Sequence, residues 1–250
     1  MIRLTSVLLL LTLSLATVTT ARADEMPVNT LPIADLKAEA DYQVKYVSEA
    51  LQNLEGDDKY DGIRKKVKRA GGTLAVVAQV IAHHPEAASA NVAAADLRVA
   101  GIAIRDAQDA ASAKTALEAA VKAYNGEASG NAEESSEWKG LIGMHDMMEV
   151  INFRSSRLRR GVRRLKNPDE EKLHAVAIAV LSVPMKADTH EVKVEAEIPD
   201  WQKMSRESQE LAVKLAKAIS ENDADSAQSI FDQLGKSCKE CHTKFRHEEE

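Results

Sequence analysis

Apolar residues recur every three to four positions along nearly all of the chain after Asp24, in segments of 15 to 25 residues. This spacing places them on one face of an α-helix, and no segment shows the sustained two-residue alternation of a β-strand. The composition agrees, because alanine is abundant while 250 residues include only 11 glycines and 6 prolines. The sequence therefore predicts an all-α fold.

Eight helices are expected, arranged as two tandem four-helix bundles. The first set covers residues 33–54, 60–83, 89–109 and 112–124, and the second covers residues 137–165, 168–183, 200–220 and 224–245. Residues 126–136 contain almost nothing to bury, which is typical of a linker. We therefore expect a first bundle within residues 24–125 and a second within residues 137–250.

Several helix ends carry local signals. Asn167 can cap the helix that follows it, and Asn222 or Asp223 can cap the last helix. Pro85 and Pro184 are each expected to end the second helix of their set. The two prolines follow similar runs of alanine and valine, which fit either duplication of one bundle or two ordinary buried helices.

The first 23 residues have the pattern of an export signal. Arg3 supplies positive charge, residues 7–15 form an almost unbroken apolar run, and residues 21–23 (Ala-Arg-Ala) have the form that signal peptidase accepts. The run is shorter than the roughly 20 residues that span a bilayer. We expect cleavage near Ala23, a periplasmic or otherwise exported protein, and no membrane span in the mature chain. The alternative is an uncleaved N-terminal anchor.

The charge balance limits the partners. With 33 basic and 39 acidic residues, the formal net charge is −6 at pH 7. Removing the first 23 residues takes away Arg3 and Arg22 and no acid, which leaves −8. An acidic protein of this kind is not expected to bind nucleic acid.

The two cysteines, Cys238 and Cys241, lie in the last expected helix and are followed at once by His242. Together they form the C-x-x-C-H pattern of c-type haem attachment. Residues three and four apart share a helix face, so both thiols and the imidazole can point to one side. The thiols can bond the two vinyl groups of a haem while His242 binds the iron as proximal ligand. We predict one covalent haem c per chain.

Three alternative roles for the motif are weaker. A zinc site needs more ligands, and only His247 is nearby. A thioredoxin-like redox pair belongs beside a strand and a helix, and no strand is expected. A plain helix with two buried cysteines is the third, but the adjacent histidine and the export signal favour haem.

The second iron ligand is expected on the first helix of the second set. Residues there follow the alternating four–three spacing of a bundle seam. They are Met144, Met148, Ile151, Ser155, Leu158, Val162 and Leu165. In an up-down-up-down bundle, the start of the first helix lies near the end of the fourth. This predicts Met148 as distal ligand, Met144 as the weaker alternative and Met147 at the side of the helix, with core filling as the other role for these methionines.

Residues 137–250 resemble cytochrome c′ and its low-spin, methionine-ligated relatives. The segment QLGKSCKECHTKFR, residues 233–246, looks like the family's last helix, including the aromatic–arginine pair Phe245 and Arg246. Trp201 stands where many relatives have an aromatic residue. The resemblance implies haem c, a four-helix bundle, an extracytoplasmic location and a haem environment that includes Trp201, Phe245 and Arg246.

The resemblance also places the distal position on the first helix, at Met148. Relatives often have an arginine one turn earlier, where this chain has Met144, so Arg246 is expected to contact a haem propionate. We expect a monohaem electron carrier with iron bound by His242 and Met148, serving a redox partner protein. The alternative is a five-coordinate haem protein that binds nitric oxide or carbon monoxide, and a third is a structural bundle. No catalytic set is visible, so an enzyme is not expected.

The first set of helices departs from the family, because it has no cysteine to attach haem. We expect a haem-free bundle that replaces the second subunit of a dimer; a homodimer of whole chains is the other arrangement. His83 and His84 are expected to be a solvated or capping pair rather than a metal site.

One helix is strongly basic within this acidic protein. Its cations are Arg154, Arg157, Arg159, Arg160, Arg163, Arg164 and Lys166. They suit a docking surface for an acidic redox partner, or the solvated face of an amphipathic helix, and the second role is the simpler one. His145, His174 and His190 are expected at the surface or in satisfied hydrogen bonds.

Overall fold

The computed structural model describes residues 28–52, 54 and 57–246, and every regular element within them is a helix. The predicted all-α fold is therefore confirmed. The expected export signal lies outside the described residues. In the part of the chain that the structure describes, no helix has the length and apolar character needed to cross a bilayer.

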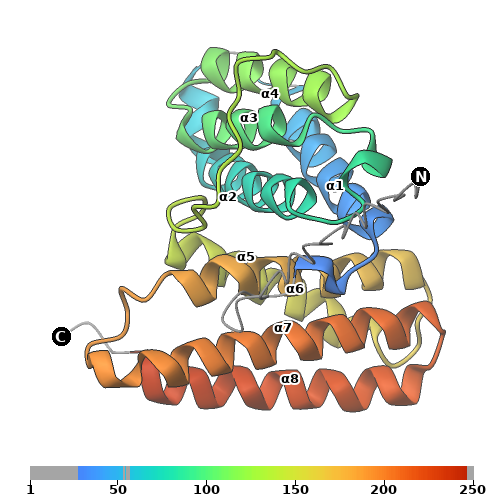
Figure 1. Ribbon diagram of the computed structural model, residues 1–250. Coiled ribbons are helices and arrows are strands. Elements are labelled where there is room, and N and C mark those ends of the chain that lie inside the picture. The colour runs from blue at the N-terminus through green and yellow to red at the C-terminus, as the bar shows by residue number, and fades with distance from the viewer. Residues whose placement is uncertain (1–27, 53, 55–56, 247–250) are drawn as a thin grey trace, which may run out of the picture.

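The first half of the chain is a closed four-helix bundle (Figure 1). It comprises η1 (Val28–Thr30), α1 (Ile33–Gln52), α2 (Asp57–Ala82), η2 (Ala87–Ala90), α3 (Ala94–Asp106) and α4 (Ala110–Tyr124). Each helix packs on the next, and α4 returns to α1. Helices α2 and α3 approach closely through facing glycines: a Cβ atom added to Gly71 would lie 2.7 Å from the carbonyl oxygen of Gly101.

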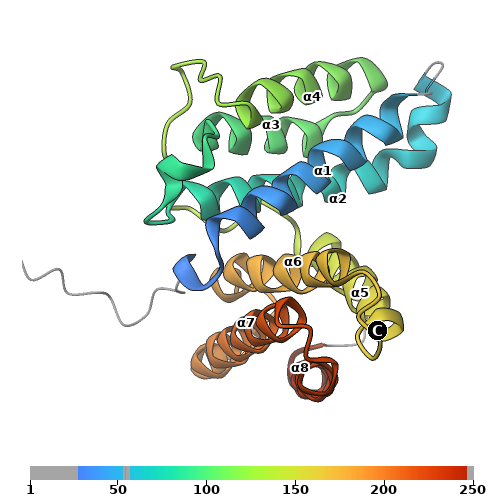
Figure 2. The same cartoon turned by 90° about the vertical axis from the view of Figure 1, so that its right-hand side faces the viewer.

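The second half is an up-down-up-down bundle, which confirms the predicted pair of bundles. It comprises α5 (Met144–Gly161), α6 (Pro168–Ala187), η3 (Glu195–Glu197), α7 (Ile198–Ser220) and α8 (Ala224–Phe245). Helix α5 packs on α6, α6 on α7 and α7 on α8. Figure 2 looks along α8 and shows these four helices grouped together below the first bundle.

Two helices begin later than expected. Helix α5 starts at Met144 because Gly140 just before it adopts a positive φ of 85°, and Gly143 then serves as the N-cap. Helix α3 starts at Ala94 because η2 is followed by Asn91, whose φ is 50°. In both cases a residue with left-handed backbone angles interrupts a segment that the apolar periodicity alone predicts as one continuous helix.

Pro184 does not end its helix, which is a correction to the expectation. Helix α6 continues through it to Ala187, whereas Pro85 does follow the end of α2. A proline removes only one helical hydrogen bond, and residues 174–186 around it are all buried.

Residues 71–81 of α2 are buried in the same way as residues 174–186 of α6, because each of these two helices is enclosed by its own bundle and by the other half. Burial on all sides is enough to favour apolar residues around a whole helix.

The caps of α6 and α8 differ in kind. Asp223 caps α8, since its carboxylate accepts a 3.0 Å hydrogen bond from the Ser226 amide. The Asn167 side chain makes no such bond to α6. Instead, the Asn167 amide donates to the Glu171 carboxylate at 3.1 Å. A side chain of α6 itself therefore satisfies the backbone N–H of the residue that precedes the helix.

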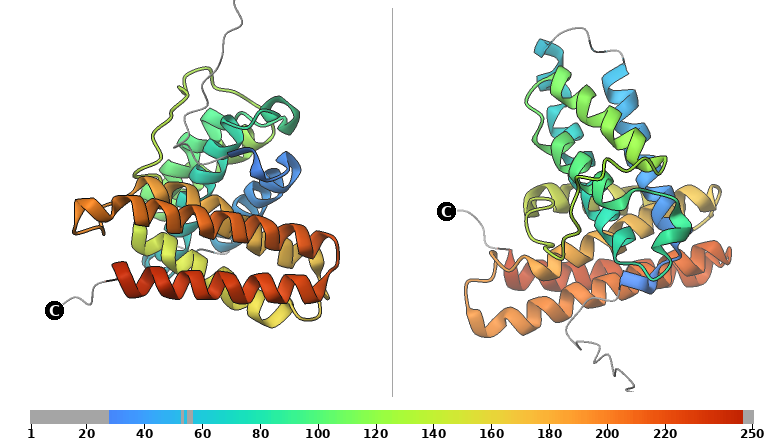
Figure 3. Two further views of the ribbon diagram at one scale, coloured as in Figure 1. Left: turned by 60° about the horizontal axis from the view of Figure 1, so that its bottom comes forward. Right: turned by 45° about the horizontal axis from the view of Figure 1, so that its top comes forward.

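The segment between the bundles is held against α2 and α3 (Figure 3). The His83 ring bonds the carbonyl oxygen of Ser135 at 2.7 Å and lies 5.6 Å from the ring of Trp138. The neighbouring His84 is buried and bonds the Leu31 carbonyl oxygen at 3.1 Å. Three further side chains donate to the segment's backbone: Gln79 to Glu137, Arg98 to Glu133, and Arg105 to Leu141. Both histidines therefore have structural partners.

The two halves meet where α1 and α2 cover α6 and the start of α5. A buried ion pair lies in this junction: Arg154 Nη2 is 2.6 Å from Glu39 Oε1, and the residues are 1% and 0% exposed. Gln43 donates to the same carboxylate oxygen at 2.7 Å, and the Tyr42 ring lies 4.1 Å from the guanidinium. Burial raises the pKa of Glu39, while the Arg154 charge opposes that rise. The expectation that Arg154 lies on a solvated or docking face is wrong, because α1 covers this side of α5.

His174 completes the junction. Its Nδ1 atom is 3.1 Å from Arg154 Nη1, and because a guanidinium can only donate, Nδ1 must be the acceptor and Nε2 carries the hydrogen. The ring is buried, and burial together with the Arg154 charge lowers its pKa to about 3. His174 is therefore neutral in the folded protein. The expectation of a fully satisfied histidine is not met, because the buried Nε2 has no hydrogen-bond partner among the described residues and the Glu170 carboxylate oxygen lies 3.7 Å away.

Replacing Arg154 tests the energetic weight of the junction. Arg154→Ala leaves the Glu39 carboxylate buried without its cation, so we expect a loss of about 3–5 kcal/mol in the free energy of unfolding, measured by urea denaturation. The control Arg159→Ala, on an exposed part of the same helix, should change it by less than about 0.5 kcal/mol. Equal effects of the two variants would contradict a buried, energetically dominant ion pair.

The depressed pKa of His174 predicts a pH dependence. The folded-state value of about 3 lies below the ordinary value of 6.5, so the unfolded chain binds more protons between these values and stability falls as pH falls. Between about pH 7 and about pH 5 the loss should be roughly 2 kcal/mol. His174→Gln, which can still accept from Arg154, should reduce this loss, whereas His145→Gln at an exposed site should not. If the urea midpoint of His174→Gln fell between these two pH values as far as that of the unmodified protein, His174 would not be the group that causes the loss of stability.

Candidate functional site

The predicted haem-attachment residues lie on the last two turns of α8. Leu234 before them and Phe245 after them are buried, at 2% and 3% exposure. Cys238 and Cys241 lie between these two on the same face, are partly buried, and pack against the core. Both thiols therefore face the bundle while keeping accessible surface.

The chemical state of the three groups suits haem attachment. Burial raises the pKa of the Cys238 thiol, and it raises that of Cys241 to about 11, with Cys238 adding to the effect. Neither cysteine is in a disulfide. His242 itself is exposed, unlike the two partly buried cysteines. The desolvation of its ring by neighbouring atoms, and then the charge of Arg246, lower the pKa of His242. At neutral pH the imidazole is thus held in its neutral form, which is the form that can bind a metal.

The end of α8 is fixed on the start of α7. The Phe245 ring meets the Trp201 ring edge to face, with centroids 5.2 Å apart. Trp201 is 3% exposed and its indole N–H donates to the Met185 carbonyl oxygen at 2.8 Å. Lys244 Nζ lies 2.5 Å from Asp200 Oδ2. The structure therefore brings together the two aromatic residues that were predicted near the haem.

Arg246 follows the last residue of α8. Its side chain is exposed, and its amide donates to the His242 carbonyl oxygen at 3.0 Å. A contact between Arg246 and a haem propionate therefore stays a prediction.

Helix α5 begins at the end of the bundle where α8 finishes (Figure 1), and its first two turns carry the three methionines. Met144 is 7% exposed, Met147 is fully buried and Met148 is partly buried against the core. The expectation that Met147 lies at the side of the helix is wrong. Met147 lies on the same face of α5 as Ile151 and Leu158, and all three are buried.

The helix that carries the cysteines is not tightly packed on the helix that carries the methionines. The backbones of α5 and α8 make far fewer close approaches than those of the other neighbouring pairs in this bundle. A planar group attached to Cys238 and Cys241 thus does not have to separate two closely packed helices. With two accessible thiols, a neutral imidazole and a thioether across the bundle, the residues present fit a c-type haem.

A zinc site at the motif gains no support from the surrounding residues. Among the described residues, no three His, Cys, Asp or Glu side chains are grouped so as to hold a metal ion. His247, the additional ligand that a zinc site would have used, lies outside those residues.

Comparison with protein families bears directly on this end of the molecule. The family model described as Cytochrome C′ matches residues 185–246. This segment is similar to cytochrome c′. It runs from the last turn of α6 to the end of α8 and includes the cysteines, His242 and the Trp201–Phe245 pair. No match was found among curated proteins or among solved structures.

The cytochrome c′ resemblance predicted from the sequence is therefore confirmed for residues 185–246. Together with the C-x-x-C-H motif, it supports a haem c-binding cytochrome. The matched segment does not include α5, so the roles of Met144 and Met148 depend on the geometry alone.

Two features of the site were not predicted. The burial of Met147 was not predicted, although its spacing of four residues from Ile151 and eleven from Leu158 puts all three on one face of α5. The ion pair between Lys244 and Asp200 depends on how α7 and α8 are aligned, and no sequence spacing reveals that alignment.

Loss of both cysteines tests the attachment. Cys238→Ala/Cys241→Ala should yield protein whose haem is lost on acid–acetone extraction, because no thioether bond remains. The control Ser237→Ala, at a buried neighbour in α8, should keep haem through the same extraction. Retention of haem by the double variant would disprove attachment at these residues.

Proposed function

We propose that the chain is an exported monohaem c-type cytochrome that transfers electrons, with His242 and Met148 as the iron ligands. The observation that carries this proposal is that the C-x-x-C-H residues end α8 within a cytochrome c′-like segment while Met148 stands on α5 at the same end of the bundle. When bound, the haem iron would supply one-electron chemistry between its ferric and ferrous states. Residues 1–23 would direct export to the periplasm.

The chain's own residues then have distinct roles. Cys238 and Cys241 hold the haem covalently, so it cannot be lost by dissociation. His242 offers a neutral imidazole, and Met148 offers a thioether that raises the reduction potential relative to a second histidine. The buried Trp201 and Phe245 rings keep this end of the core apolar and exclude water.

A second candidate function rests on the packing of Met148. It is only partly buried, so packing does not fix its thioether as firmly as that of the fully buried Met147. If Met148 does not bind the iron, the distal side is open and the protein would bind nitric oxide or carbon monoxide instead.

The first bundle is proposed to take the place of a partner subunit, giving an internal pseudo-dimer rather than a homodimer. This is supported by the way α1 and α2 cover α6 and the start of α5, and by the buried Arg154–Glu39 pair. The covered flank is then not free to receive a second copy of the chain. A redox partner would have to approach elsewhere.

Absorption spectra of the purified protein test the ligand assignment. With His242 and Met148 as ligands, the reduced protein should show sharp, low-spin bands that do not change on adding carbon monoxide. Met148→Ala should become high-spin and bind the gas, while Met144→Leu should keep the original spectrum. If the unmodified protein is already high-spin and responds to carbon monoxide, the gas-binding function replaces electron transfer.

A further inference from the structure

The outer surface of α5 and the turn after it carry an exposed basic face that the haem site does not use. We define this basic face as Phe153, Arg157, Arg159, Arg160, Arg163, Arg164 and Lys166, all of them exposed. Phe153, Arg157 and Arg160 are spaced four and three residues apart, so they form one stripe along α5, and Arg164 lies in the turn that follows it. The stripe lies on the side of α5 opposite to its buried core residues.

Most of these cations have no partner of their own. Arg157 is 3.2 Å from the Glu170 carboxylate, and Arg163 donates to the Gln228 side chain at 3.3 Å. Within the described part of the chain, the remaining four cations of the basic face have no acidic side chain at ion-pair distance. Their charges are therefore available to an external partner.

The basic face also contrasts sharply with the rest of the molecule. The basic face carries six cations and no acid, while the whole chain has a formal net charge of −6. All other residues together therefore carry −12. An acidic partner would be repelled by most of the surface and attracted here, so the charge distribution selects one orientation of approach.

Stabilisation of α5 does not account for every residue of the basic face. Cations in the last turn of a helix interact favourably with its dipole, which explains Arg159 and Arg160. It does not explain why Phe153, two turns earlier, is 48% exposed with the Arg157 guanidinium 5.9 Å from its ring centroid. An exposed aromatic ring within a cluster of arginines is typical of protein interfaces.

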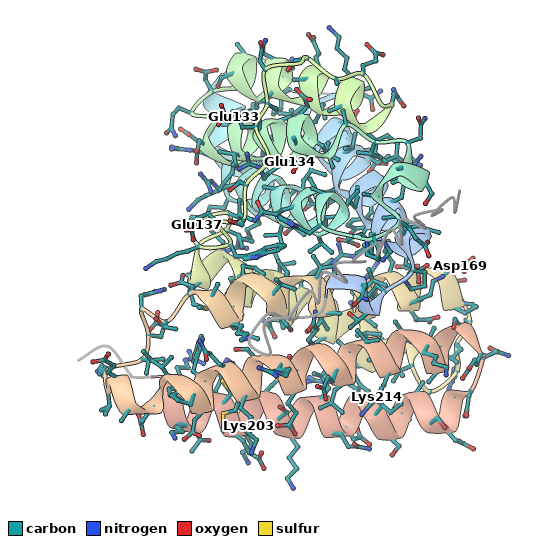
Figure 4. All side chains as sticks on the ribbon, in the orientation of Figure 1. Glu133, Glu134, Glu137, Asp169, Lys203 and Lys214 are labelled. Carbon is teal, nitrogen blue, oxygen red and sulfur yellow. The ribbon has the colours of Figure 1, made fainter. Side chains whose placement is uncertain are left out.

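The basic face lies at the far end of the bundle from the haem-attachment residues. It adjoins the start of α6, where Asp169 is labelled in Figure 4, whereas α8 ends on the opposite side of the picture. Along α5, Arg160 is about 18 Å from Met148, from the rise per residue of a helix. The basic face is thus suited to holding a partner, not to passing an electron directly from the iron.

We propose that this basic face docks an acidic protein surface, whose carboxylates meet Arg160 and Arg164 and whose apolar side chain meets Phe153. A membrane surface fits less well, because an interfacial helix needs a broad apolar face and that of α5 is buried in the bundle. This inference does not depend on whether the iron transfers electrons or binds a gas.

Binding of a short fluorescent poly-L-glutamate peptide to the haem-loaded full chain, measured by anisotropy, tests the proposal. The peptide should bind, more weakly as salt rises, and Arg160→Glu/Arg164→Glu should weaken binding about tenfold, since two exposed pairs are lost and repulsion is added. The control Lys203→Glu/Lys214→Glu makes the same charge change on α7, at the positions labelled in Figure 4, and should leave binding within about twofold of the unmodified protein.

Three results would overturn the proposal. The first is equal weakening by both double variants, which would mean attraction without a defined surface. The second is unchanged binding in Arg160→Glu/Arg164→Glu. The third is binding to phosphatidylglycerol vesicles but not to the peptide, which would identify a lipid surface instead. The absorption spectrum of the haem serves as the folding control, because Arg160 and Arg164 lie at the other end of the bundle and do not touch the haem-attachment residues.

Discussion

The buried pair of Arg154 and Glu39 fixes how the two halves of this protein lie against each other. Taking two charges out of water is costly, and the cost is offset only while the 2.6 Å contact and its surrounding hydrogen bonds are intact. If the halves separated, Glu39 and Arg154 would each need solvent or a new partner. The junction therefore has a narrow range of acceptable geometries, and α5, which carries both Arg154 and Met148, is positioned by it.

Much of this architecture could be predicted from the sequence because its signals are local. Helix α8 begins and ends where expected, since Asp223 caps one end and its apolar stripe continues to Phe245. The C-x-x-C-H motif is equally local, because helical spacing alone brings the three groups to one side. The family resemblance assigned Trp201 and Phe245 to one haem environment, and the two rings are in contact in the structure.

The remaining features depend on contacts between distant segments, which periodicity cannot reveal. Arg154 follows Ile151 and precedes Leu158 on an apolar stripe, and Glu39 lies directly before the buried Ala40. A cation on the apolar stripe of α5 and an acid on that of α1 are a sequence signal for a buried ion pair. The signal can be used only when it is known that these two helices pack together. Pro184 is a second case, because only the packing around it shows that α6 continues.

The anchored segment between the bundles has a consequence for the covalent chain itself. Hydrogen bonds from α2 and α3, together with the contact between His83 and Trp138, tie it to the first bundle beyond residue 130. A protease that cut the chain near Gly130 would leave the downstream end still attached to α2 and the ion pair still buried. Chain continuity is thus not what keeps the halves together, and a nicked protein would sediment and elute as one particle until a denaturant separated it.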